Sequence, residues 1–138
     1  MRISEQFNQK DSEYIKKKVI EHNMEKIPNQ VKTANKNIGF FLKDDSGEIV
    51  GGITANMFWH HIHIEFLWVD KRFRGEGYGG MLVDKLEGFA REKAVRLIYL
   101  DSFSFQAPEF YQKKGYEVFG KIEDHPKGFD LYFLQKRF

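Results

Sequence analysis

A glycine-rich segment near the middle of the chain constrains its fold more than any other feature. Residues 74–80 read Arg-Gly-Glu-Gly-Tyr-Gly-Gly, directly after the apolar run 66–69 and directly before a helical pattern of apolar residues over 81–90. Glycines at such a strand-to-helix junction let the backbone adopt positive φ angles and approach a ligand closely. The free N–H groups and the dipole of the new helix favour bound phosphate. The segment therefore predicts a ligand that carries phosphates.

Nucleotides are one class of such ligands. Gly75, Gly77 and Gly80 satisfy the dinucleotide pattern G-x-G-x-x-G, and Asp101 lies at about the spacing of the acid that binds the ribose. A dinucleotide fold, however, needs parallel βαβ units, whereas the segment before the loop has the pattern of an antiparallel meander. A phosphate-loop NTPase is less favoured still, because no Gly-Lys-Ser or Gly-Lys-Thr follows. A nucleotide-binding oxidoreductase is therefore kept only as a less favoured alternative.

The same loop also fits a second pattern. Arg74, Gly77 and Gly79 fill Q/R-x-x-G-x-G/A, and one helix and one strand later residues 107–116 read Ala-Pro-Glu-Phe-Tyr-Gln-Lys-Lys-Gly-Tyr. In these two motifs the chain resembles the GCN5-related N-acetyltransferase (GNAT) family, over roughly residues 38–136. The resemblance implies an enzyme that transfers the acetyl group of acetyl-CoA directly to a primary amine. It also implies that the loop binds the pyrophosphate of acetyl-CoA, through Arg74, Gly75, Glu76, Gly77, Tyr78, Gly79 and Gly80.

Length and composition agree with one catalytic domain over residues 1–138. A chain of 138 residues with 41% hydrophobic residues can bury a core but leaves no room for two ordinary domains. The net charge of +2 does not indicate a nucleic-acid partner. The absence of cysteine excludes disulfides and an acetyl-cysteine intermediate. No apolar run is long enough to cross a membrane and no signal-peptide pattern is present, so we expect a cytoplasmic protein.

Hydrophobic patterning predicts the order of the elements. Helices are expected over 12–26, from the glycine loop to about 93, and over 108–114; strands are expected over 38–43, 48–57, 61–69, 96–100, 117–122 and 130–135. Residues 44–47, Asp-Asp-Ser-Gly, predict a hairpin turn. The fold class is therefore α/β (α+β), a GNAT-like, mixed and mainly antiparallel sheet of six or seven strands flanked by helices. Acetyl-CoA is expected where the third strand and the strand of Leu97 diverge.

Acetyl transfer to an amine needs a base, a donor for the oxyanion and an acid for the departing thiolate. Alternation along residues 61–69 places His61, His63, Glu65, Leu67 and Val69 on one face of the third strand. An imidazole accepts a proton near neutral pH, and a carboxylate does so when it is buried. Among the titratable groups of this face, the family resemblance implies His63 and Glu65 as the candidate bases, from their spacing before Val69. The alternative is that both are solvent-facing residues and that the acceptor binds already deprotonated.

The family resemblance implies roles for three further residues. The family stabilises the oxyanion with a backbone amide at a bulge near the end of this strand, which corresponds to Val69. Tyr111 matches the family's tyrosine beside the sulfur, and a phenol can give its proton to a thiolate; simple packing of the short helix is the alternative. Ser104 stands where the family often has an asparagine that contacts the pantetheine arm, and serine can still donate one hydrogen bond.

The third strand also invites a metal-site interpretation. Two histidines and a carboxylate can form a non-haem iron site, and His-x-His on a strand can ligate zinc. No further cluster of His, Asp or Glu has ligand spacing, and His60 is expected on the opposite face from His61 and His63. We therefore expect no metal.

The acceptor is the least determined part of the prediction. The first helix, Phe58, Trp59 and His61 suggest a pocket with aromatic surface, which a polyamine, an amino acid, an antibiotic or a protein terminus could enter. The expected partner is a small-molecule or peptide amine, with no nucleic acid and no membrane; a homodimer is one option. The competing function is a non-catalytic acyl-CoA-binding or sensing module, in which the loop is kept but the base and acid are not needed.

Overall fold

The computed structural model describes residues 1–138, which fall into two units, residues 1–32 and residues 33–138. Each unit is described by itself, and the expectation of one domain stays a prediction. The first unit holds helix α1 (Gln9–Lys26) and the short 3-10 helix η1 (Asn29–Val31). Helix α1 begins earlier than predicted because the side chain of Asn8 accepts hydrogen bonds from the first free N–H groups of the helix. None of the helices combines the length and the apolar character that crossing a membrane requires.

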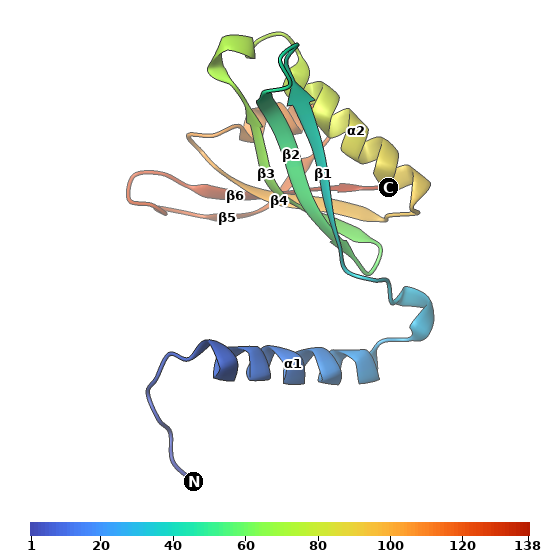
Figure 1. Ribbon diagram of the computed structural model, residues 1–138. Coiled ribbons are helices and arrows are strands. Elements are labelled where there is room, and N and C mark those ends of the chain that lie inside the picture. The colour runs from blue at the N-terminus through green and yellow to red at the C-terminus, as the bar shows by residue number, and fades with distance from the viewer. The chain divides into compact units, whose positions relative to one another are not determined.

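The second unit is built around a six-stranded sheet (Figure 1). Its strands are β1 (Lys36–Lys43), β2 (Ile49–Phe58), β3 (His61–Val69), β4 (Leu97–Phe103), β5 (Glu117–Ile122) and β6 (Leu131–Arg137). In space they follow the order β1-β2-β3-β4-β6-β5, and the only parallel pair is β3 with β4. The predicted mixed, mainly antiparallel sheet is thus confirmed with six strands. The antiparallel meander β1-β2-β3 confirms the argument against a dinucleotide fold.

Helix α2 (Tyr78–Glu92) lies against one face of the meander (Figure 1). Its buried apolar side chains recur at helical spacing: Leu82, Val83, Leu86 and Ala90. They share one core with strand residues that are fully buried, among them Ile62 and Ile98. Burying a side chain of this size contributes about 1.5–3 kcal/mol. The core therefore fixes the position of the first turn of α2, and of the glycine loop before it, relative to the sheet.

The short helix α3 (Pro108–Lys113) has the termini that the sequence predicts. Pro108 occupies its first turn, where a missing N–H has no cost, and Gly115 follows its end with φ +93°. The helix contacts β5 and β6. The second motif, residues 107–116, therefore lies beside β5 and β6.

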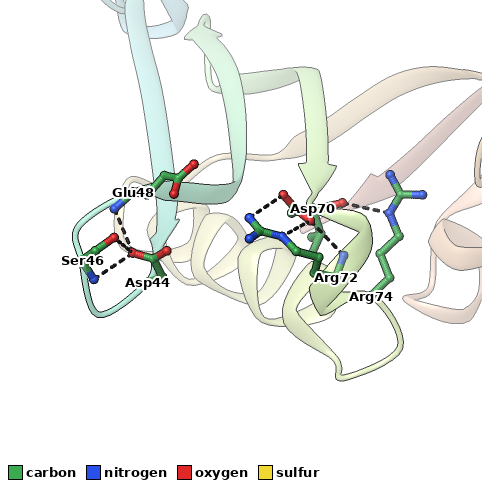
Figure 2. A network of polar contacts seen from close by, with 7 residues as sticks. Asp44, Ser46, Glu48, Asp70, Arg72 and Arg74 are labelled. Atoms are coloured by element: carbon green, nitrogen blue, oxygen red, sulfur yellow. Dashed lines mark hydrogen bonds and ion pairs between the residues drawn. The ribbon is translucent and has the colours of Figure 1, made fainter.

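The predicted hairpin turn joins β1 to β2. Asp44 accepts hydrogen bonds from the backbone N–H of Ser46 at 2.9 Å and from that of Glu48 at 3.0 Å (Figure 2). Gly47 adopts φ +86°, and a Cβ added there would meet no atom within 4 Å. The turn is therefore held by Asp44 and by the backbone freedom of one glycine.

Strands β3 and β4 pair over a short stretch and then diverge. Their register covers His61 with Leu97, Ile62 with Ile98 and His63 with Tyr99, and no pairing follows. Beyond this stretch β3 continues to pair with β2, and β4 with β6. The sheet therefore has an opening between its two halves at the predicted place.

A β-bulge interrupts the pairing of β2 with β3. Thr54 pairs with Phe66, whereas the next residue, Ala55, pairs with Ile64, so Glu65 is an extra residue in β3. A bulge of this kind bends its strand and re-aims the side chains that follow it. Glu65 is exposed at this bend, beside the opening between β3 and β4.

The bulge corrects two predictions about β3. His61 and His63 lie on the face away from the core, whereas Leu67 and Val69 pack against the core. The prediction that these residues and Glu65 share one face was wrong, because an inserted residue reverses the alternation beyond it. The bulge also lies at Glu65 rather than at Val69, where the family resemblance had placed it.

Candidate active site

The glycine loop joins β3 to α2 through two residues in the left-handed region. Gly75 has φ +81° and Gly77 has φ +87°, a region that glycine enters at little cost. Gly77 is the N-cap residue of α2 and supplies no capping side chain, so the first N–H groups of the helix stay available to a ligand. A Cβ added at Gly75 or Gly77 would meet no atom of the protein within 4 Å. The loop is therefore an open turn, with space in which a ligand can approach its backbone.

Two arginines flank the end of β3, and they have different partners. Asp70 accepts hydrogen bonds from Nε and Nη2 of Arg72, both at 3.0 Å, and these bonds lower the pKa of Asp70 and raise that of Arg72. Arg74 donates from Nε to the carbonyl oxygen of Val69 at 2.9 Å. The two arginine side chains extend to opposite sides of Asp70 (Figure 2). Arg74 keeps its terminal amino groups free, so it is the cation available to an anion on the loop.

Two neighbouring cavities follow the opening between β3 and β4. The larger one, here called the loop cavity, measures about 670 Å³ and is lined by Leu67–Val69, Phe73–Gly75, Gly77–Gly80, Phe105–Ala107 and Phe110. The smaller one, the inner cavity, measures about 130 Å³ and is lined by Ile64–Leu67, Leu100–Ser102, Gln106, Ala107 and Tyr111. The two cavities share Leu67, Gln106 and Ala107. The two cavities are therefore neighbours along the opening, one beside the glycine loop and one beside Tyr111.

Most of the predicted loop residues line the loop cavity: Val69, Arg74, Gly75, Gly77, Tyr78, Gly79 and Gly80. Glu76 is exposed and lies outside the lining. Ser104 also lies outside it, because its hydroxyl accepts a hydrogen bond from the N–H of Asp130 at 3.1 Å. The lining also includes Phe105, Gln106 and Phe110, which we did not predict. Their only sequence signal was their place in or next to the second motif.

Val69 presents its backbone to the opening. The N–H of Asp70 donates to the carbonyl of Val50 at 2.7 Å, and Val69 pairs with Gly51. In an antiparallel ladder the pair next to a hydrogen-bonded pair directs its N–H and C=O groups outward. The N–H of Val69 therefore points away from β2, to the side from which β4 has diverged. Arg74 binding the carbonyl of Val69 agrees with this orientation.

Tyr111 lines the inner cavity from α3 and is 5% exposed. Its ring packs edge-on against Phe110 at 5.1 Å and against Tyr116 at 5.7 Å between ring centroids. Burial raises the pKa of Tyr111 to about 12. The phenol therefore keeps its proton at neutral pH and is available as a hydrogen-bond donor at the inner cavity.

The two candidate bases occupy different positions. Glu65 lines the inner cavity together with Tyr111, whereas His63 lies outside the lining and stacks on Tyr99 at 4.7 Å between ring centroids. The neighbouring His61 is partly buried, and burial and the charge of His63 lower its pKa. The structure thus brings Glu65, but not His63, to the cavity of Tyr111. No group of three or more His, Asp or Glu side chains is arranged as metal ligands.

Comparison with known proteins places this arrangement among acetyltransferases. A model of the "Acetyltransferase (GNAT) family" matches residues 4–116. Blasticidin-S acetyltransferase from Streptomyces morookaense is 37% identical over 93 residues, which are 67% of this chain and 68% of that protein. The crystal structure of an acetyltransferase from Bacillus cereus ATCC 14579 is 47% identical, with a TM-score of 0.96 over 99% of this chain and 98% of that one.

A more distant solved structure has the same fold and a bound ligand. It is an acetyltransferase from Bacillus anthracis str. Ames in complex with acetyl coenzyme A. It is 23% identical to this chain and has a TM-score of 0.66, over 77% of this chain and 64% of that one. At 23% identity this similarity shows that the two proteins share a fold.

Proposed function

This chain belongs to the acetyltransferase (GNAT) family, and from that premise we propose which of its residues carry the reaction. It is an enzyme that uses acetyl-CoA as cosubstrate and transfers the acetyl group to an amine. One observation supports the assignment of residues above all others. The loop cavity and the inner cavity share Leu67, Gln106 and Ala107; the open glycine turn lines the first, and Glu65 and Tyr111 line the second.

We place the pyrophosphate of acetyl-CoA on the glycine loop. The free N–H groups at the start of α2 and the terminal amino groups of Arg74 would hold its charge. Glu76 contributes only its backbone in this proposal, because its side chain is exposed and outside the lining. The hydroxyl of Ser104 accepts one hydrogen bond from the N–H of Asp130, and its O–H stays available to donate to the pantetheine arm. The thioester then lies in the inner cavity.

Three groups would carry the chemistry, without a covalent intermediate. The N–H of Val69 donates to the oxygen of the attacked carbonyl, and a single donor of this kind is typically worth a factor of about 10²–10³. Glu65 takes the proton that the attacking amine loses as its C–N bond forms. Tyr111 gives its proton to the sulfur as the C–S bond breaks, a step typically worth about 10²–10⁴.

We propose Glu65 as the direct base and His63 as a base that acts through water. Glu65→Gln and His63→Gln remove the base while keeping the size of the side chain. The variant that lacks the true base should need a higher pH to reach its maximal kcat/KM, because more of the amine is already deprotonated there. Unchanged profiles in both variants would show that the acceptor binds in its neutral form.

The proposed function is tested by binding and turnover together. Acetyl-CoA, CoA and NAD are each added in a thermal-shift assay, and thiol release from acetyl-CoA is followed with a panel of amines. We expect acetyl-CoA and CoA to stabilise the protein, because a ligand at 100 times its Kd contributes about 2.7 kcal/mol to the free energy of unfolding. We also expect thiol release with a subset of the amines. Stabilisation by NAD alone would contradict the assignment, and binding without thiol release for any amine would favour the non-catalytic module.

The relative from Streptomyces morookaense is named for acetylating blasticidin S. We propose that the acceptor of this chain is likewise a small-molecule amine rather than a protein. A homodimer and a cytoplasmic location stay predictions. Light scattering after size-exclusion chromatography checks the first and cell fractionation checks the second.

A further inference from the structure

Two carboxylates line the inner cavity, and the mechanism uses only one of them. Glu65 enters from β3 and Asp101 from β4. Both side chains are exposed, and neither forms an ion pair or a hydrogen bond with another side chain. Two other acids of this unit are paired with cations: the partly buried Asp70 with Arg72, and the exposed Asp84 with Lys114. The negative charge of the inner cavity is therefore uncompensated by the protein.

The backbone explains the position of Asp101. Its neighbours Leu100 and Ser102 are buried on the core side of β4, so Asp101 points to the opposite face, the face of His63 and Tyr99. The opening between β3 and β4 begins one residue before Asp101, after the pair of His63 with Tyr99. Asp101 thus stands at the inner end of the opening, across from the bulge that carries Glu65.

Aromatic residues lie near these two acids on the same two strands, β3 and β4. Phe66 lines the inner cavity directly after Glu65 and is 73% exposed, and Trp68 is 49% exposed. The stacked rings of His63 and Tyr99 lie on the same face at the closed end. Carboxylates beside aromatic surface form an environment that attracts organic cations, through charge and through the faces of the rings.

Resting on the proposed function, we propose that the acceptor is a small amine with a second positive charge, and that Asp101 binds that second charge. The dication enters a cavity that carries two negative charges. The reacting ammonium first loses one proton to solvent, Glu65 takes the second proton as the C–N bond forms, and Tyr111 protonates the departing sulfur, while the other ammonium stays paired with Asp101. The acetylated product carries one positive charge fewer, which weakens its binding and favours its release. An acceptor with a carboxylate near its amine is repelled by Asp101.

The test uses three acceptors of nearly equal size: 4-(aminomethyl)benzylamine, 4-methylbenzylamine and 4-(aminomethyl)benzoate. We measure kcat/KM per amino group by thiol release for the wild type, for Asp101→Asn and for the control Asp45→Asn. Asp45 is exposed in the hairpin turn outside both cavities, so its replacement changes the net charge equally.

In the wild type kcat/KM for the dication should exceed that for the monocation 4-methylbenzylamine by about fivefold, and kcat/KM for the benzoate should fall below that of the monocation by a similar factor. Asp101→Asn should abolish most of both differences while the KM for acetyl-CoA stays within about twofold, and Asp45→Asn should preserve them. Equal kcat/KM for all three acceptors, or equal losses in the two variants, would overturn the role of Asp101 and leave the acetyltransferase intact. Thiol release with another amine of the panel but with none of these three would overturn the role of Asp101 alone, whereas thiol release with no amine of the whole panel would overturn both proposals.

Discussion

Replacing Gly77 by valine separates the backbone role of the glycine loop from its role in binding. Gly77 has φ +87°, where a residue with a Cβ costs about 1–2 kcal/mol. No protein atom lies within 4 Å of the added Cβ, so no steric clash adds to this cost. A domain of this size has about 5–15 kcal/mol of stability. We therefore expect Gly77→Val to fold, with a melting temperature lower by about 3–8 °C.

The ligand response is the second part of this prediction. Acetyl-CoA at 100 times its Kd should stabilise the wild type by about 2.7 kcal/mol. Gly77→Val should show no such gain, because the valine side chain occupies the space in which the phosphates approach the backbone. Binding is measured by thermal shift and confirmed by calorimetry on the folded variant.

Gly47→Val is the matched control. Gly47 has φ +86° and no atom within 4 Å of an added Cβ, but it lies in the hairpin turn between β1 and β2. It should lose the same few degrees and keep the full response to acetyl-CoA. A normal response in Gly77→Val would show that the loop is only a structural turn. Loss of folding in Gly77→Val but not in Gly47→Val would refute the estimate of strain.

Three other substitutions test single groups. Tyr111→Phe keeps the packed ring and should lower kcat on the order of a hundredfold or more with little change in the KM for acetyl-CoA; unchanged kcat with rate-limiting chemistry would return Tyr111 to a packing role. Arg74→Gln should weaken acetyl-CoA binding about tenfold in calorimetry, whereas Arg72→Gln should leave it nearly unchanged because Arg72 already pairs with a carboxylate; equal losses would refute this distinction. The folded protein lowers the pKa of His61, by burial and then by the charge of His63, so its stabilising contribution is present above the unfolded pKa of about 6.5 and is lost as the pH falls through the folded value. When the pH is lowered from 7.5 to 5, the melting temperature of His61→Phe should therefore fall less than that of the wild type. An equal fall in the two proteins would show that His61 does not cause this pH dependence.

The elements of the second unit could be predicted because burial shapes their sequence. Strand β3 has the predicted bounds, 61–69, since apolar residues mark both of its halves. The bulge at Glu65 could not be predicted, because it depends on the pairing register of β2 with β3, which no single residue type indicates. The start of α1 was placed too late for a simpler reason: its first turn is polar, and only the cap at Asn8 marks it.

The candidate site divides in the same way. The glycine loop is continuous in the chain, so its glycines and Arg74 are visible in the sequence. The inner cavity joins Glu65, Asp101 and Tyr111, which are far apart in the chain and meet only through the order of strands in the sheet. Sequence spacing suggested only a ribose contact for Asp101. Spacing does not show that β4 lies beside β3, and this neighbourhood is what brings Asp101 to the cavity of Glu65.

The divergence of β3 from β4 also affects how the protein behaves when no cosubstrate is bound. On the side of the opening, each of these strands has an edge that pairs with no other strand, although it lies in the interior of the sheet. A free edge is a template for a strand from another molecule, and natural proteins normally cover their edges. A pantetheine arm in the opening would cover both edges. We therefore expect the empty enzyme to aggregate more readily than the loaded one, so that the cellular supply of CoA would influence its lifetime as well as its rate.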